Sequence, residues 1–157
     1  RIESARVRAY HAADARPLTV EDWSGIDAAA AGALRVELHP SLTVIRSAYP
    51  AATIWATNQP GREPEPVRAR RAEAVAVARP REAVAVTPIP IAEARFLDAL
   101  ARSRTLAEAA ETAAAPDPSG PALAADAEEF DLTRALSTLL RGGLAVALHP
   151  PALRTRT

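Results

Sequence analysis

The chain has 157 residues, of which 19 are basic and 19 acidic, so its formal net charge at pH 7 is zero. This length suits one domain, or two small domains that share an interface. Every basic residue is arginine, and the charges also balance separately before and after Gln59. A domain that binds duplex DNA usually carries a basic excess that neutralises phosphates. The composition therefore argues against a nucleic-acid partner.

Several kinds of chemistry are excluded or disfavoured by composition. The chain has no cysteine, which excludes disulfides, thiolate nucleophiles and cysteine metal sites. No apolar run reaches the roughly 18 residues that a membrane-spanning helix needs, so we expect a cytoplasmic protein with no membrane partner. The histidines His11, His39 and His149 lie too far apart to form a local metal motif. We expect no cofactor and no metal in this chain.

Residues 1–59 read as the C-terminal part of a helical domain with a connecting strand and helix. Apolar residues on one side predict a helix over Ile2–Ala13, and a second short helix starts near Leu18 and carries Trp23. The chain begins inside the first of these helices and contains no methionine. We therefore expect it to be the C-terminal part of a longer protein.

A strand and another helix are predicted in the rest of this region. Apolar alternation and β-branched residues over Leu34–Ser47 indicate an extended strand, kinked at Pro40. Pro50 can begin a helix at its first turn, and that helix carries Trp55. Neither Trp23 nor Trp55 has the basic neighbours of a base-stacking site, so we expect both to be core residues or anchors of a partner interface.

Residues 60–72 read as a linker, because prolines, a glycine and charges dominate and no hydrophobic period is present. The linker could add a strand near Val67. Residues 73–149 then form the second predicted unit, and residues 150–157 form a tail.

The second unit begins with a predicted β-hairpin. Val75 and Val77 alternate with alanine before a turn at Arg79–Glu82, and Val84 and Val86 alternate with alanine after it. Because side chains alternate along a strand, all four valines are expected on one buried face.

Three helices and a short strand are predicted after the hairpin. The first helix starts at Pro90, and the second is capped by Thr105 with Glu108 three residues later. Asp131 caps the third helix, which ends at Gly142–Gly143. A last strand could follow over Leu144–Leu148. The pattern predicts an α+β fold that is mainly helical with a small antiparallel sheet, and a winged-helix-like C-terminal unit.

Such a small sheet leaves one strand edge open. An open edge can accept an extended peptide as an added strand, although the hairpin could equally serve only to pack the unit together. The pattern alone leaves both readings open. If a peptide binds, we expect it to lie along the second hairpin strand and to face the third helix, contacting Val84, Ala85, Val86, Thr87, Leu136 and Leu140.

Two other functions match parts of the sequence less well. The third helix could read DNA in a transcription regulator, but only Arg134 and Arg141 offer basic side chains there. The acidic pair Glu128–Glu129 precedes a helix cap and suits the helix dipole better than acid–base catalysis. No nucleophile motif is present, so we do not expect an enzyme.

Five segments together resemble a bacterial family usually labelled as DNA-binding-domain-containing proteins. They are ARVRAYHAADARPL (5–18), LHPSLTVIRSAYPAATIWATNQ (38–59), the hairpin, IAEARFLDALARSRTLAEAAETA (91–113) and FDLTRALSTLLRGGL (130–144). Members of this family are partner subunits of multinuclear non-haem iron-dependent oxidases that modify ribosomally made precursor peptides. The resemblance implies a leader-recognition-type fold in a non-catalytic adaptor, which holds the precursor's leader as an added β-strand and presents it to the oxidase. The metal then belongs to the oxidase.

Overall fold

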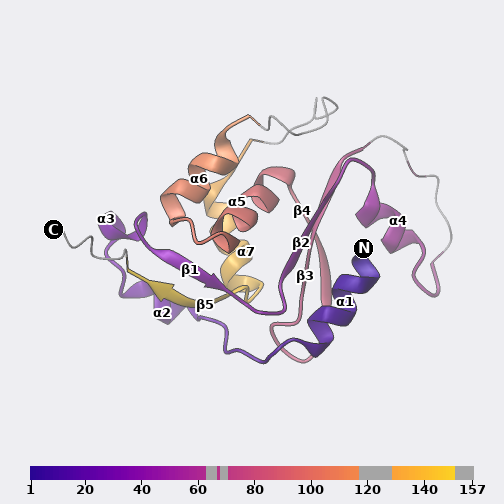
Figure 1. Cartoon of the computed structure of the whole chain (residues 1–157), viewed down its shortest axis with the longest axis horizontal. Helices are drawn as coiled ribbons and strands as arrows, with labels where there is room; N and C mark the ends of the chain where they lie inside the picture. Colours follow the sequence, from indigo (N-terminus) through magenta and orange to yellow (C-terminus); the bar gives the residue numbers. More distant parts are fainter. Residues whose placement is uncertain (63–66, 68–70, 117–128, 151–157) are drawn as a thin grey trace.

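The computed structural model describes residues 1–62, 67, 71–116 and 129–150 (Figure 1). In this part of the chain, seven α-helices accompany five strands in two small antiparallel sheets. The predicted α+β class is confirmed. None of the helices in the described residues is long and apolar enough to cross a membrane.

The larger sheet has three strands in the order β2 (Thr43–Ser47), β3 (Glu73–Ala78) and β4 (Ala85–Ile89). Both neighbouring pairs are antiparallel. Strands β3 and β4 form the predicted hairpin. The third strand is supplied by β2, whereas Val67, where a strand was considered, lies outside any strand.

Helices cover both faces of this sheet (Figure 1). On one face, Val75 and Val77 pack with residues of α1 (Ile2–His11) and α4 (Ala51–Thr57), in a cluster that partly buries Val84 and Val86. The predicted shared face of the four valines is thus confirmed. On the other face, the hairpin alanines pack with the helices that follow, namely α5 (Ile91–Ala101), α6 (Leu106–Ala114) and α7 (Leu132–Arg141).

The second sheet pairs β1 (Arg35–Leu38) with β5 (Ala145–His149) in antiparallel register. The single kinked strand predicted over Leu34–Ser47 is therefore two strands that join different sheets. The turn between them contains Pro40, which has no backbone N–H, and is closed by the N–H of Leu42 bonding to the carbonyl of His39 at 2.9 Å.

The two predicted units share their sheets. Strand β2 precedes residues 60–72 and pairs with β3 beyond them, and β1 pairs with β5 near the end of the chain. The predicted boundary at 60–72 therefore does not separate two independent cores. Residues 63–66 and 68–70 of the predicted linker, and 151–157 of the predicted tail, lie outside the described residues.

Capping explains where the later helices begin. The Thr105 side chain accepts the N–H of Glu108, whose carboxylate accepts the N–H of Thr105, as the predicted capping box requires. Asp131 accepts the N–H of Arg134 at 3.0 Å at the start of α7. Two short helices, α2 (Val20–Ser24) and α3 (Ala28–Ala31), connect α1 to β1.

The end of α7 depends on Gly143. Its φ of +61° lies in the left-handed region that glycine adopts without strain. A Cβ placed there would lie 3.0 Å from Cβ of Pro80 and 3.2 Å from the ring of Pro17. Gly143 therefore lets the hairpin turn and the segment after α1 approach the end of α7 closely.

Candidate peptide-binding edge

Strand β4 forms one edge of the three-stranded sheet. It pairs with β3 on one side, and no strand in the described residues lies on its other side. Ala85, Thr87 and Pro88 are exposed, Val86 is partly buried and Ile89 is buried. An edge of this kind presents backbone groups that another extended chain could pair with.

The opposite edge, β2, is more occupied. A guanidinium nitrogen of Arg1 donates to the carbonyl of Arg46 at 3.3 Å, and Arg46 Nε lies 3.3 Å from Oδ2 of Asp98 on α5. Burial raises the pKa of Asp98 above its usual range, and the positive charges of Arg46 and Arg102 offset only part of this rise. The Arg1 side chain, just before α1, therefore engages the β2 backbone, the Asp98 side chain on α5 holds a β2 side chain, and β4 is the freer edge.

The structure separates the predicted peptide-contacting residues onto two faces. Val84 and Val86 point toward the cluster formed with α1 and α4, whereas Leu136 packs against the cluster formed by α5, α6 and α7. Val86 is paired with Val77, which is fully buried in the α1 cluster, and alternation turns Ala85 and Thr87 to the opposite face. The two valines were expected to face Leu136, and this prediction is wrong. The exposed side chains on the Leu136 side of the sheet are those of Ala85 and Thr87.

Leu140, the last residue of the predicted site, is partly buried on α7. Thus an open strand edge is present at β4, but the six predicted contact residues do not face one common peptide site between this strand and α7.

Trp55 on α4 contacts two residues of α1. Its indole N–H donates to the carboxylate of Glu3 at 2.7 Å, and the Arg6 guanidinium carbon lies 5.6 Å from the centroid of the indole ring. The bond from Trp55 is the main reason that the pKa of Glu3 is lowered. Trp55 is only partly buried, so its ring is both a packing element and part of the surface.

Trp23 has a different environment. It lies on α2 and packs, partly buried, against the core formed with α5, α6 and α7. Its indole nitrogen is buried and has no hydrogen-bond partner among the described residues. Of the two predicted interface tryptophans, Trp55 lines an open cleft.

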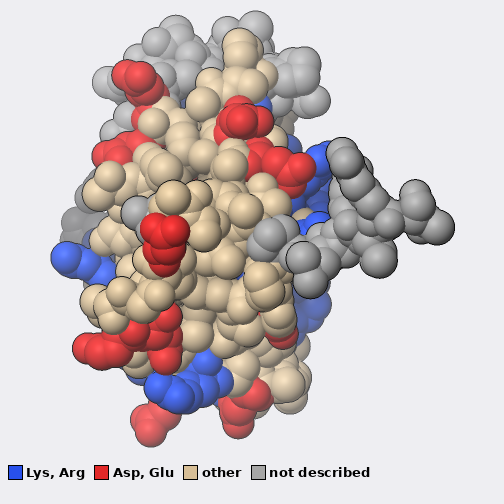
Figure 2. Space-filling model, turned by 90° about the vertical axis from the view of Figure 1, so that its left-hand side faces the viewer, with Lys and Arg blue, Asp and Glu red and all other residues tan. Residues whose placement is uncertain are grey.

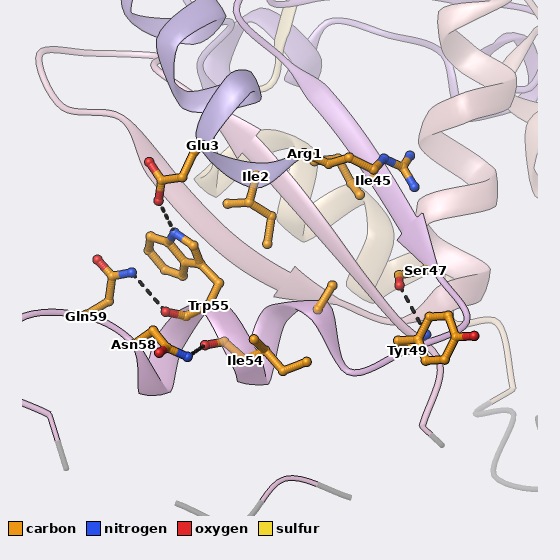
Figure 3. Close-up of a pocket in the computed structure, with 11 residues that line it drawn as sticks. Arg1, Ile2, Glu3, Ile45, Ser47, Tyr49, Ile54, Trp55, Asn58 and Gln59 are labelled. Carbon is orange, nitrogen blue, oxygen red and sulfur yellow. Dashed lines mark hydrogen bonds between the residues drawn. The ribbon is translucent and has the colours of Figure 1, made fainter. Parts of the chain in front are cut away.

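That cleft lies between α1, β2 and α4 and has a volume of about 660 Å³ (Figure 3). Ile2 and Ile45, both buried, are among its lining residues, as are the exposed side chains of Tyr49 and Ile54. Sequence reasoning missed this cleft. Only the apolar spacing of Tyr49, Ile54 and Trp55 hinted at it, because the other wall comes from a distant helix.

A buried polar cluster surrounds His39. The backbone N–H of Ser41 donates to Nδ1 of His39 at 3.2 Å, so Nε2 carries the proton and donates to the carbonyl of Ala15 at 3.2 Å. The Ser41 hydroxyl oxygen lies 2.8 Å from Nδ1 and accepts the N–H of Arg79 at 2.7 Å. His39 and Ser41 are each only 2% exposed, so this pair has no access to a substrate and serves packing.

Several charged side chains of the described residues form ion pairs. Of the two basic residues weighed for DNA reading, Arg134 has its Nε 3.8 Å from an oxygen of the buried Glu93 on α5, whereas Arg141 is exposed. The face drawn in Figure 2 shows acidic groups and a few basic groups scattered over a largely uncharged surface. No group of three or more acidic or histidine side chains that could hold a metal ion occurs in the described part of the chain.

Comparisons with protein-family models, curated proteins and solved structures found no match to this chain.

Proposed function

We propose that this chain is a non-catalytic, peptide-recognising partner of an iron-dependent peptide-modifying oxidase. It binds the leader of a ribosomally made precursor peptide as a strand added to β4 and presents the peptide to the oxidase. The observation that carries the proposal is the outer edge of β4, which has no strand beside it in the described residues. The order of elements after α4 also supports it, since the β3–β4 hairpin is followed by three helices, as expected for a leader-recognition-type winged helix.

The energetics suit a peptide ligand. In strand addition, backbone hydrogen bonds supply affinity and alternate side chains supply selectivity. Each backbone bond contributes a net ~0.5–1.5 kcal/mol, so a few bonds with apolar contacts give useful affinity. Ala85 and Thr87 are small and exposed, and they leave room beside the strand on the side of the sheet that carries α5, α6 and α7.

We assign the oxidase contact to the cleft around Trp55. Protein interfaces concentrate their binding energy in tryptophan, tyrosine and arginine, and the cleft lining includes Trp55, Tyr49 and Arg1 with the exposed Ile54. This cleft lies on the α1 and α4 side of the sheet, so a partner seated there leaves the exposed side chains of Ala85 and Thr87 uncovered.

The test is to search the neighbouring genes for an iron-dependent oxidase and a short precursor peptide, and to measure the binding of each candidate by calorimetry. We expect both to bind, with Ile54→Arg lowering oxidase affinity at least tenfold and leaving peptide affinity within twofold. The exposed substitution Val20→Arg, on α2, serves as the matched control for added charge. If neither partner binds, the proposal is wrong. Salt-dependent binding to duplex DNA would also contradict it, because such binding is expected of a transcription regulator.

A further inference from the structure

A proline determines which backbone groups of β4 point outward. Pro88 pairs with Val75 of β3 but has no N–H to donate to it. Residue pairs in an antiparallel ladder alternate between hydrogen-bonded and non-hydrogen-bonded positions, and proline in an edge strand occupies the position whose nitrogen faces away from the sheet. Ala85, Thr87 and Ile89 therefore bond to β3, while the backbone groups of Val86 and Pro88 face outward.

The other edge of the sheet supports the same alternation independently. The Arg46 carbonyl accepts a bond from the Arg1 side chain, which places this carbonyl on the outer side of β2. Arg46 is paired with Ala74, and Ala74 is paired with Ile89. If Arg46 faces outward, the backbone groups of Ala74 point toward β4, so that Ala74 and Ile89 form a hydrogen-bonded pair.

We infer that strand addition at β4 is anchored on the single residue Val86 and is limited by Pro88, an inference that rests on the proposed function. Val86 offers both a donor and an acceptor to an incoming strand, whereas Pro88 offers only its carbonyl oxygen. The ligand class is a short extended peptide segment whose central residue, opposite Val86, is not proline, because it must donate its own N–H.

The side chains of the ligand follow from the same register. Directly opposed residues in a sheet share a face, so the central residue of the peptide lies on the Val86 side. Its two neighbours lie beside Ala85 and Thr87, where the small side chains leave space. We expect large apolar residues at these two neighbouring positions.

Hydrogen exchange of the free protein tests the register without any ligand. The Val86 amide is expected to exchange at least tenfold faster than the amides of Ala85 and Thr87, which are bonded to β3. The reverse pattern would overturn the inference and leave the proposed function standing, because the edge would still be open.

Synthetic peptides that tile the candidate precursor peptide, identified from the neighbouring genes, test the anchor. Val86→Pro removes the outward donor and is expected to weaken binding of the best peptide tenfold or more, while Pro88→Ala adds a donor and should strengthen it about threefold to tenfold. Ala85→Pro is the matched control for the register, since it removes a donor to β3 and lowers the melting temperature. If Val86→Pro fails to fold, the affinity of Pro88→Ala and the protection of the Val86 amide by bound peptide still test whether Val86 is the anchor.

The outcomes separate the two proposals. If a peptide binds Val86→Pro and Pro88→Ala with wild-type affinity and leaves the Val86 amide of the wild type unprotected, Val86 is not the anchor. The proposed function as a peptide-binding protein would still stand. Failure of every tile to bind wild-type protein overturns both.

Discussion

The hydroxyl oxygen of Ser41 accepts the backbone N–H of Arg79 at 2.7 Å, although 38 residues separate them. This bond joins the turn after β1 to the end of β3. The Arg79 guanidinium then donates to the carbonyls of Ala9 at 3.0 Å and Ala12 at 2.7 Å near the end of α1. The two sheets and α1 thus meet at one small polar cluster.

Ser41→Ala should destabilise the protein by about 1–3 kcal/mol, because it removes the hydroxyl that accepts the Arg79 N–H and leaves this partly buried donor without an acceptor. Urea unfolding followed by circular dichroism measures the change. Ser4→Ala, at an exposed position of α1, is the control and should change the free energy of unfolding by less than about 0.5 kcal/mol. Equal effects of the two substitutions would show that the cluster contributes nothing.

Gly143→Ala should destabilise the fold by about 1 kcal/mol or more, because alanine pays for a positive φ and its Cβ meets Pro80 and Pro17. Gly25→Ala is the matched comparison, since its φ is −84° and a Cβ there meets nothing within 4 Å. Thermal unfolding should show a lower midpoint for the first variant only. A wild-type midpoint for Gly143→Ala would contradict the close approach of these segments.

Thr105→Ala should cost about 1 kcal/mol of stability, because the side-chain acceptor at the start of α6 is lost. Thr112→Ala, an exposed threonine in the same helix, should cost less than about half of that. Denaturant midpoints of both variants provide the measurement, and a larger effect at Thr112 would argue against the capping box.

Asp98→Asn tests the pH dependence produced by a half-buried carboxyl group. Because burial raises its pKa from the ordinary 3.8, the native state holds this proton more tightly than the unfolded state does. The protonated Asp98 carboxyl therefore stabilises the native state below pH 3.8, and this contribution is lost as the pH rises through the raised pKa of Asp98 in the native state. Relative to wild type, the variant should gain stability as pH rises through this window.

Glu108→Gln should show the opposite trend. The backbone N–H of Thr105 lowers the pKa of Glu108, so its contribution is present above the ordinary glutamate value of 4.5 and is lost as pH falls. The variant should therefore approach wild-type stability as the solution is acidified. Unfolding curves at several pH values between 3 and 7 compare both variants, and parallel pH profiles for the two would show that neither shift is real.

Local signals predicted the later helices and their caps. Thr105, Asp131 and Gly143 act on backbone groups within a few residues, so the sequence alone locates these helix ends. The hairpin was equally accessible, because its valines alternate on both sides of a proline-containing turn. The sequence did not reveal that Leu34–Ser47 forms two strands in different sheets, since their partners lie far along the chain.

The candidate site was only partly predictable for the same reason. An edge strand near Val86 follows from the hairpin, but which face of it meets α7 depends on α1, which packs over the valines from the far end of the chain. The cleft beside Trp55 likewise needs α1 and α4 together.

Charge balance, the absence of cysteine, the helix caps and the alternation of the hairpin were determined by the sequence itself, because each depends on composition or on neighbours a few residues apart. Tertiary structure alone decided that β2 completes the sheet, that α1 covers its valine face and that β4 is left as the freer edge. These depend on contacts between distant segments, where many pairings satisfy the same hydrophobic pattern and only packing selects one.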